Sequence, residues 1–456
     1  MPNQCAAGDS NRGGVEELHR PGQISLVKRS TRVPIARRRW RIGWLLGLGV
    51  LVNYFDRVNL SVSHGALTDT FGVSDITFGY LLGAYNWTYA LCQLPIGVVL
   101  DKLGVKLVGR ISTLVWSVAS FGAAVAPGLH SLFAARFLLG VGEAPTFPAN
   151  AKAIGVWFPQ QERSFATSLF DSAAKFAPAI GVPLIGMLLL HIGWRLSFAA
   201  TGLISLLYFA LFFAVYREPE DDPGLGEEER AYMQPDRVSA ASATIQQSSL
   251  GYLMQQKKVL GLALGFGSYN YVFYLLLAWL PSYLSQSLQI DLLHSFAYTG
   301  VPWLIATATD LLIGGLLVDA LIQRGWNAGR VRMTVLVGGT ALGLGIFGAG
   351  LSHGPIQALA WISLSIGGLS AAAPVGWSIP SLIAPEGSVG RVGGILNFSN
   401  QLSGIAAPIV TGYLVYAHHS FTLAFAVAGA YLVAGICGYL ILLRDLRRIP
   451  SQAEQS

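Results

Sequence analysis

The chain has 456 residues, of which 53% are apolar and only 12% are charged, and its formal net charge is +6. Soluble domains average about 25% charged residues, so this composition excludes an ordinary water-soluble protein and favours one that lies in lipid. The positive residues stand mostly between apolar runs, which argues against a nucleic-acid-binding surface. The three cysteines, Cys5, Cys92 and Cys437, lie far apart, so we expect neither a disulfide framework nor a metal site, and we expect no cofactor.

Residues 1–39 contain no apolar stretch of signal-peptide length and become basic toward their end, so we predict a disordered cytoplasmic tail. Twelve apolar runs follow, each about as long as the roughly 20 residues that a membrane-spanning helix needs. The runs cover residues 40–62, 77–100, 105–127, 131–155, 164–190, 194–216, 258–283, 296–319, 332–352, 355–379, 391–416 and 421–443. We therefore predict an all-α membrane protein with twelve transmembrane helices.

One long polar segment, 217–257, separates the first six runs from the last six and contains the acidic stretch EPEDDPGLGEEER. We predict a six-helix bundle over 40–216, a cytoplasmic linker over 217–257, a second six-helix bundle over 258–443 and a cytoplasmic tail over 444–456. If the N-terminus is cytoplasmic, the positive-inside rule requires outer loops poor in Lys and Arg. Neither residue occurs in the loops 63–76, 128–130, 191–193, 284–295, 353–354 and 417–420. Both termini are therefore predicted to be cytoplasmic.

A short motif recurs in the two halves. Gly97-x-x-x-Asp101 closes the run 77–100, and Gly315-x-x-x-Asp319 closes the run 296–319, 218 residues later. Parallel repetition of this kind is expected of a transporter whose binding site lies between two bundles near the middle of the membrane.

Several stretches resemble those of a known family. GVVLDKLGVK (97–106) matches the loop signature of the major facilitator superfamily. Within it, the chain is similar to the anion:cation symporter family, whose bacterial members import hexuronates, aldonates, glucarate and tartrate. The matching stretches are NYFDRVNLS (53–61), YALCQLPIG (89–97), RFLLGVGEAPTFPAN (136–150), WFPQQER (157–163) and NFSNQLSGIAAPIVTG (397–412). The resemblance covers roughly 40–445 and implies a multi-pass protein of the bacterial inner membrane.

Charged residues inside the predicted spans are the most informative ones. Each costs at least about 2.5 kcal/mol at the bilayer centre, so each needs a partner or a wet cavity. They are Asp56, Arg57, Arg136, Glu143, Asp171, Lys175 and Asp310.

The resemblance implies proton coupling by Glu143 and Asp56, and binding of the substrate anion by Arg57 and Arg136. A guanidinium stays charged and can hold a carboxylate through two hydrogen bonds, which suits the arginines to this task. The alternative is a purely structural role, with each carboxylate permanently paired. Arg136 and Glu143 share a helix face but are separated by about 10 Å of helix rise, so direct contact between them is not expected.

Polar side chains from other runs could complete the site. By resemblance, Tyr89 lines the cavity, although a generic membrane tyrosine is the alternative. The second half supplies further candidates, of which Asn397 is the best for a substrate hydroxyl, and hydrogen bonding between helices is their alternative role. These candidates are Tyr269, Asn270, Tyr274, Asn397, Asn400 and Gln401.

Asp171 and Lys175 depart from the family pattern, in which sugar-acid members commonly carry small or neutral residues here. They stand four residues apart, so they can pair on one helix face. Either they neutralise each other, or Lys175 contacts a second carboxylate of the substrate, which would favour a dicarboxylate. Asp310 is either a third titrating site or a hydrogen-bonding residue between helices. In the loop signature, Asp101, Lys102 and Lys106 are predicted to act at the inner gate.

Together these patterns predict a monomeric secondary transporter that takes up a small organic anion, a sugar acid or dicarboxylate, with protons. A drug or metabolite exporter of the same fold is one alternative, although cavity arginines disfavour cationic substrates. A sodium-coupled anion symporter is another, because intramembrane carboxylates suit either ion. A membrane-embedded enzyme is not expected, since no nucleophile elbow, HExxH motif or phosphate loop occurs.

Overall fold

The computed structural model describes residues 37–233, 248–290, 292–386 and 388–452, and the regular structure of these residues is helical throughout. Most of the predicted tail 1–39, the middle of the predicted linker 217–257 and the last residues of the tail 444–456 lie outside the described residues. The first half contains α1 (Arg38–Val62), α2 (His64–Phe71), α3 (Asp75–Ala124), α4 (Leu129–Glu143), α5 (Thr146–Trp157) and α6 (Gln160–Val215).

The two longest helices, α3 and α6, each contain two of the predicted runs. The helix path breaks inside α3 at Gly104, with φ of 74°, and inside α6 at Gly193, with φ of 78°. Glycine adopts this left-handed region without the steric cost that other residues meet, so it allows the chain to reverse between two spans. The run 131–155 is also interrupted: α4 ends at Glu143 and α5 begins at Thr146, around Pro145, where proline disfavours a continuous helix.

The second half has the same layout of long helices with local interruptions. Two short helices, α7 (Glu227–Met233) and α8 (Leu250–Gln255), fall within the predicted linker. The elements that follow are α9 (Lys257–Ser282), the π-helix η2 (Tyr283–Ser287), α10 (Leu292–Thr309), the π-helix η3 (Asp310–Leu317), α11 (Val318–Gln323), α12 (Ala328–Gly343), α13 (Gly345–Gly350), α14 (Pro355–Ile383), α15 (Val389–His418), α16 (Thr422–Cys437) and the π-helix η4 (Gly438–Leu443).

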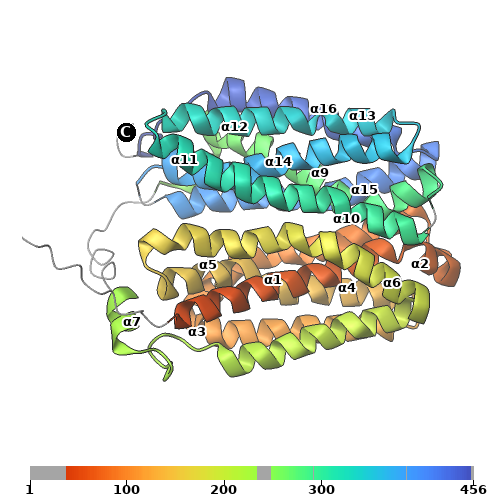
Figure 1. Cartoon of the computed structure of the whole chain (residues 1–456), viewed down its shortest axis with the longest axis horizontal. Helices are drawn as coiled ribbons and strands as arrows, with labels where there is room; N and C mark the ends of the chain where they lie inside the picture. The colour runs from red at the N-terminus through yellow and green to blue at the C-terminus, as the bar shows by residue number, and fades with distance from the viewer. Residues whose placement is uncertain (1–36, 234–247, 291, 387, 453–456) are drawn as a thin grey trace, which may run out of the picture. The chain divides into compact units, whose positions relative to one another are not determined.

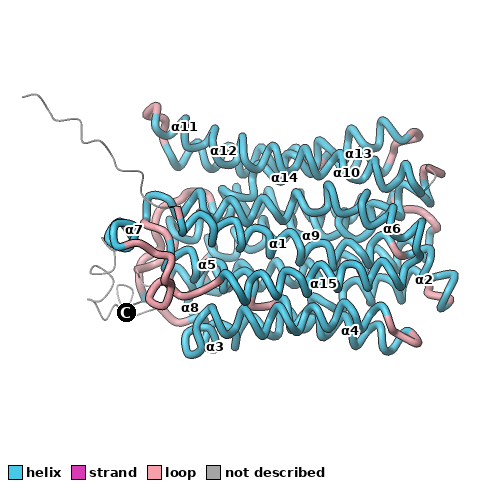
Figure 2. The backbone as a smooth tube through the Cα atoms, turned by 60° about the horizontal axis from the view of Figure 1, so that its bottom comes forward, coloured by secondary structure: helices cyan, strands magenta, loops and turns pink. Residues whose placement is uncertain are grey.

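The long helices run side by side, with α1–α6 gathered on one side and α9–α16 on the other (Figure 1). The end that carries α7 is called the α7 end, and the opposite end, which carries α2, is called the α2 end (Figure 2). Seven helical stretches among the described residues are long and apolar enough to cross a membrane, and one of them, Phe165–Val215, has 51 residues. Each of the twelve predicted runs lies mostly in helix, but their number as separate spans and their orientation stay predictions.

Small residues bring the two halves into backbone contact near the α2 end. A methyl group on Gly79 of α3 would come within 2.6 Å of the carbonyl oxygen of Pro408 in α15. A methyl group on Gly300 of α10 would come within 2.5 Å of the carbonyl oxygen of Ala179 in α6. Toward the α7 end of α3 and α15, a methyl group on Gly97 or Gly394 would meet no described atom within 4 Å. The halves are thus packed closest toward the α2 end.

Candidate functional site

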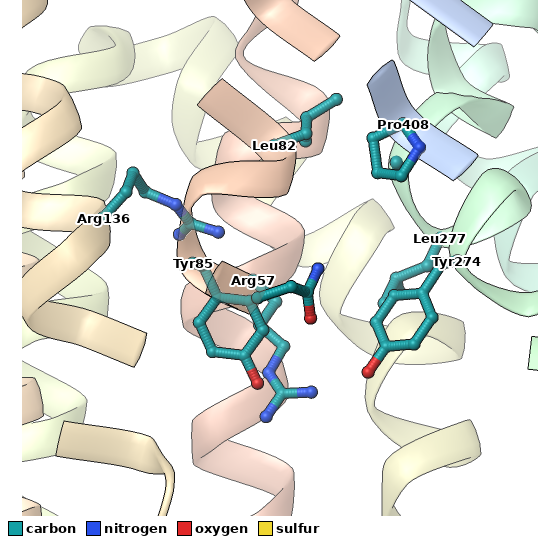
Figure 3. A pocket seen from close by; sticks show the side chains of 9 residues that line it. Arg57, Leu82, Tyr85, Arg136, Tyr274, Leu277 and Pro408 are labelled. Carbon is teal, nitrogen blue, oxygen red and sulfur yellow. The ribbon is translucent and has the colours of Figure 1, made fainter. Parts of the chain in front are cut away.

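A small cavity lies between the two halves, and residues of both halves line it. Arg57, Tyr85 and Arg136 stand on one side of it, facing Tyr274, Leu277 and Pro408 on the other (Figure 3). Its remaining lining residues are Leu82, Asn86 and Ala278. Two guanidinium groups thus face a small, partly polar space that helices α1, α3, α4, α9 and α15 enclose.

Arg57 forms the central ion pair of this cavity. Its Nε donates a hydrogen bond to Oε2 of Glu143 at 2.9 Å, and both side chains are buried. The guanidinium carbon lies 4.4 Å from the ring centroid of Tyr54, 4.5 Å from that of Tyr85 and 5.7 Å from that of Tyr89. Aromatic faces attract a cation through their quadrupole, so these rings help to hold the charge in place.

Glu143 is the last residue of α4 and lies two residues before Pro145. The glutamate's own helix carries another arginine, Arg136. As expected from the helix rise, Arg136 is not the ion-pair partner: it donates from Nη1 to the backbone oxygen of Asp56 at 3.3 Å. The Asp56 carboxylate itself accepts a hydrogen bond from Ser205 Oγ at 2.8 Å.

Several buried polar atoms around the cavity have no hydrogen-bond partner among the described residues. They include Arg57 Nη2, Arg136 Nε, Glu143 Oε1 and Asn86 Oδ1. Buried donors of this kind are costly when left unpaired, because burial removes the water that would otherwise bond them. The two arginines therefore retain capacity for an anionic acceptor.

A second buried charge cluster lies apart from the cavity lining. Lys175 Nζ donates to Oδ2 of Asp171 at 2.6 Å, which is the predicted pairing within one helix. The same Nζ lies 2.5 Å from Oδ2 of Asp310, the first residue of η3. Lys175 thus has two carboxylate partners from the protein itself. The prediction that it contacts a substrate carboxylate would require one of these contacts to open.

The predicted residues of the second half are divided between several environments. Tyr274 lines the cavity, whereas Tyr269 packs against Phe266 at a centroid distance of 5.1 Å. Asn270 donates to the carbonyl oxygen of Phe266 in its own helix at 3.0 Å.

The amides of α15 differ in the same way. Asn397 donates to Gln93 Oε1 of α3 at 3.2 Å, which joins the two halves. Asn400 is buried, and neither its Nδ2 nor its Oδ1 has a hydrogen-bond partner among the described residues. Gln401 is also buried, and its Oε1 has no hydrogen-bond partner among the described residues. Both amides therefore keep hydrogen-bonding capacity inside the molecule.

The predicted gate residues lie toward the α7 end. Lys106 Nζ lies 3.3 Å from Oδ2 of Asp221, and its backbone N–H donates to Glu218 Oε1 at 3.1 Å. Lys102 is exposed, and the side chain of Asp101 lies outside the described residues. These contacts connect the loop signature to the segment after α6, and they leave the gating role a prediction.

Sequence reasoning missed Tyr54, Tyr85 and Asn86. Tyr85 stands four residues before Tyr89, and Tyr54 three residues before Arg57, so helical spacing places each on the same face as its predicted neighbour. Asn86 donates to the carbonyl oxygen of Gly404 at 2.8 Å and joins α3 to α15. Spacing could have found the tyrosines, whereas no signal in the sequence pointed to Asn86.

Comparison with known proteins agrees with this architecture. The family model described as Major Facilitator Superfamily matches residues 46–408. The chain belongs to this superfamily. It is a multi-pass transporter of the inner membrane, not an enzyme.

Three curated relatives match nearly their whole length. The Bacillus subtilis (strain 168) protein named "Uncharacterized transporter YybO" is 39% identical, over 90% of this chain and 95% of its own. A D-galactonate transporter of Escherichia coli O6:H1 is 30% identical, over 91% and 97% of the two chains. The probable galactarate/D-glucarate transporter GarP of Escherichia coli K12 is 31% identical, over 91% and 96%. The names of the last two relatives match the resemblance to sugar-acid members of the anion:cation symporter family.

Among solved structures, a bacterial homologue of the human lysosomal transporter Spinster, in an inward-facing and occupied conformation, superposes with a TM-score of 0.71. It is 16% identical and covers 90% of this chain and 97% of its own. At this identity the likeness concerns the fold, which is that of the major facilitator superfamily.

Proposed function

We propose that the transporter imports a sugar acid together with protons by alternating access between its two halves. The observation that carries the proposal is the buried Arg57–Glu143 ion pair beside a cavity that Arg57 and Arg136 both line. A guanidinium that is paired with a protein carboxylate can exchange this partner for a substrate carboxylate, because both offer the same pair of acceptor oxygens.

The relatives support the substrate class. Their names specify galactonate and galactarate or glucarate, which are polyhydroxylated carboxylates. The cavity combines two cations for a carboxylate with Tyr274 and Asn86 for hydroxyl groups. An exporter of cationic compounds would have to place its substrate beside these arginines, and their repulsion makes that alternative unfavourable.

The balance of charges in the site explains why the substrate and a proton move together. In the unloaded site Glu143 neutralises Arg57. When a substrate carboxylate takes over Arg57, Glu143 loses its cation partner inside a water-poor region, where an isolated negative charge is expensive. Binding a proton removes this charge. Substrate and proton therefore enter together, and the neutralised site can move between the two membrane faces. Asp56, whose backbone oxygen holds Arg136, is the second candidate for a proton.

The present conformation fits one stage of this cycle. With the α7 end cytoplasmic, as the positive-inside pattern predicts, the close glycine contacts at the α2 end seal the outer face. The substrate would then exchange with the cytoplasm in this state. Opening the α2 end requires these contacts to separate while the halves close near α7.

The decisive experiment uses purified protein in liposomes and the variant Glu143→Gln. We expect the wild type to accumulate galactonate when the outside is acidic. We expect Glu143→Gln to exchange labelled for unlabelled galactonate but to lose accumulation driven by the proton gradient. Normal gradient-driven accumulation by this variant would refute the assignment of Glu143.

Two controls complete this test. Asp69→Asn removes an exposed carboxylate in α2, far from the cavity, and should behave like the wild type. Replacing external sodium by choline should leave uptake unchanged, and a loss of uptake would show sodium coupling instead. Galactarate and glucuronate, tested in parallel, separate a diacid from a monoacid preference.

A further inference from the structure

Three charged side chains meet between the two halves, outside the cavity of the candidate site. Lys175 of α6 contacts Asp171 one helical turn away and Asp310 of η3, at 2.6 Å and 2.5 Å. The side chains of Lys175 and Asp310 are only 4% and 3% exposed, whereas that of Asp171 is 22% exposed. One cation thus holds one carboxylate from each half of the chain.

The cluster is not electrically balanced. Lys175 supplies one positive charge against two carboxylates, and it is the only cation that interacts with Asp310 among the described residues. The other titratable groups facing it are the phenols of Tyr269 on α9 and Tyr54 on α1, which carry no charge near neutral pH. With both aspartates ionised, the cluster keeps one uncompensated negative charge inside the membrane.

Such a charge is expensive in a water-poor interior, and a bound cation would remove it. A metal ion would have to take the space between the two carboxylates, which the Nζ of Lys175 fills at hydrogen-bond distance from both. A proton needs no such space, because it binds to one carboxyl oxygen. When two carboxylates share a site, one of them takes up a proton far more readily than an isolated one.

We propose that Asp310, held by Lys175 beside the carboxylate of Asp171, is a second proton-binding site, which takes up one proton per transport cycle in addition to the site at Glu143. This inference rests on the proposed function, since it concerns protons that move with the substrate. Protonation leaves Lys175 with a single ionised partner, so the cluster becomes neutral. When the proton resides on Asp310, the ion pair between α6 and η3 is lost, and a bond between the two halves weakens.

The sum of the charges inside the predicted spans gives the expected number of protons per substrate molecule. The seven charged residues predicted inside the spans comprise three cations and four carboxylates, and a monocarboxylate substrate adds one more negative charge. Two protons neutralise the loaded protein, one at the arginine site and one at the lysine cluster. We therefore expect two protons per monocarboxylate, and one per monocarboxylate when the lysine cluster cannot titrate.

The test compares the wild type with Asp310→Asn and Asp171→Asn in liposomes. Each variant leaves Lys175 with one carboxylate, so each cluster is neutral and retains an ion pair. The proton-to-galactonate ratio follows from the substrate gradient that stops net flux at an imposed pH gradient. Both variants should lose one coupled proton, which lowers the galactonate gradient at balance about tenfold per pH unit of proton gradient. Asp69→Asn is the matched control and should keep the wild-type ratio.

The outcomes separate this inference from the proposed function. A wild type without proton coupling would overturn both. A wild type that couples protons, with unchanged ratios in both aspartate variants, would overturn only the lysine-cluster site. If one variant does not fold, the other still decides, because the shared charge disappears in either. A ratio that changes with sodium rather than with pH would also overturn the proposal, since it would identify a sodium site.

Discussion

At the scale of single residues, the candidate site depends on Arg57, whose guanidinium is held in place by neighbouring side chains. Arg57 has Glu143 at its Nε and tyrosine rings around its guanidinium, and its Nη2 has no hydrogen-bond partner among the described residues. A lysine in its place would keep the charge but lose the planar fork of N–H donors that matches a carboxylate. Substitution of Arg57 by lysine therefore separates the effect of its charge from the effect of its hydrogen-bonding geometry.

We expect Arg57→Lys to raise the KM for galactonate about 10- to 100-fold, the effect of losing roughly 1.5 to 3 kcal/mol of charged hydrogen bonding. The measurement is concentration-dependent uptake at fixed pH, with Arg41→Lys as the control because Arg41 is exposed near the start of α1. An unchanged KM in Arg57→Lys would mean that Arg57 acts only as a point charge or does not touch the substrate.

At the scale of elements, α2 contributes a contact between the halves outside the predicted spans. His64 Nδ1 lies 3.1 Å from Ser282 Oγ of α9, and its Nε2 lies 3.3 Å from Oδ1 of Asp75. Its ring stacks on Phe78 at 4.0 Å. A neutral ring satisfies both contacts, if Nε2 carries the hydrogen and Ser282 donates to Nδ1. Burial lowers the pKa of His64 to about 4, from an ordinary value of 6.5.

This shift predicts how stability depends on pH. The pKa of His64 is lower in the folded than in the unfolded protein, so the unfolded protein binds more protons between the two values. The contribution of His64 to the free energy of unfolding is therefore fully present above about pH 6.5. It is lost as the pH falls toward 4, and the loss is on the order of 3 kcal/mol. The melting temperature of the purified protein should fall from pH 7 to pH 5, and less so in His64→Gln. Equal falls in both proteins would contradict this role of His64.

The local breaks in the helices show what sequence reasoning could and could not reach. Apolar length located the long helices, but not the short helices α2, α7 and α8 or the break between α4 and α5. The pairing of Lys175 with Asp171 followed from their spacing within one helix. The contact with Asp310 did not, because it joins residues far apart in the chain, and the wider turns of η3 have no signature in composition. The Arg57–Glu143 pair was hidden for the same reason.

At the scale of the whole molecule, orientation in the membrane decides which end of the helices faces the cytoplasm. The outer loops predicted from the sequence contain neither Lys nor Arg, whereas the segment that follows α6 contains Arg217 and α7 contains Arg230. Arg39 ties α7 to the first half, donating to Glu229 Oε1 at 2.9 Å and to Glu162 Oε2 at 2.7 Å. These ion pairs stay at the α7 end, as a cytoplasmic surface would require.

Labelling of single cysteines tests this orientation. In a background with Cys5, Cys92 and Cys437 replaced by serine, a cysteine at Asp69 in α2 should react with an impermeant maleimide in intact cells. A cysteine at Glu228 in α7 should react only after permeabilisation. Both positions are exposed, so the result depends only on whether the maleimide can reach that side of the membrane. The reverse pattern would contradict the predicted topology and would place the closely packed α2 end at the cytoplasm.

The tyrosine rings around Arg57 bear on stereochemistry. The guanidinium carbon lies 4.4 Å from the ring centroid of Tyr54 and 4.5 Å from that of Tyr85, so these rings restrict the directions from which a ligand can reach it. A carboxylate held by two parallel hydrogen bonds from a guanidinium lies nearly coplanar with it, which fixes the direction in which the substrate's carbon chain leaves the carboxyl group. Two epimers that differ at the neighbouring carbon would point their hydroxyl groups toward opposite walls. We therefore expect the transporter to distinguish a sugar acid from its epimer at the carbon next to the carboxylate.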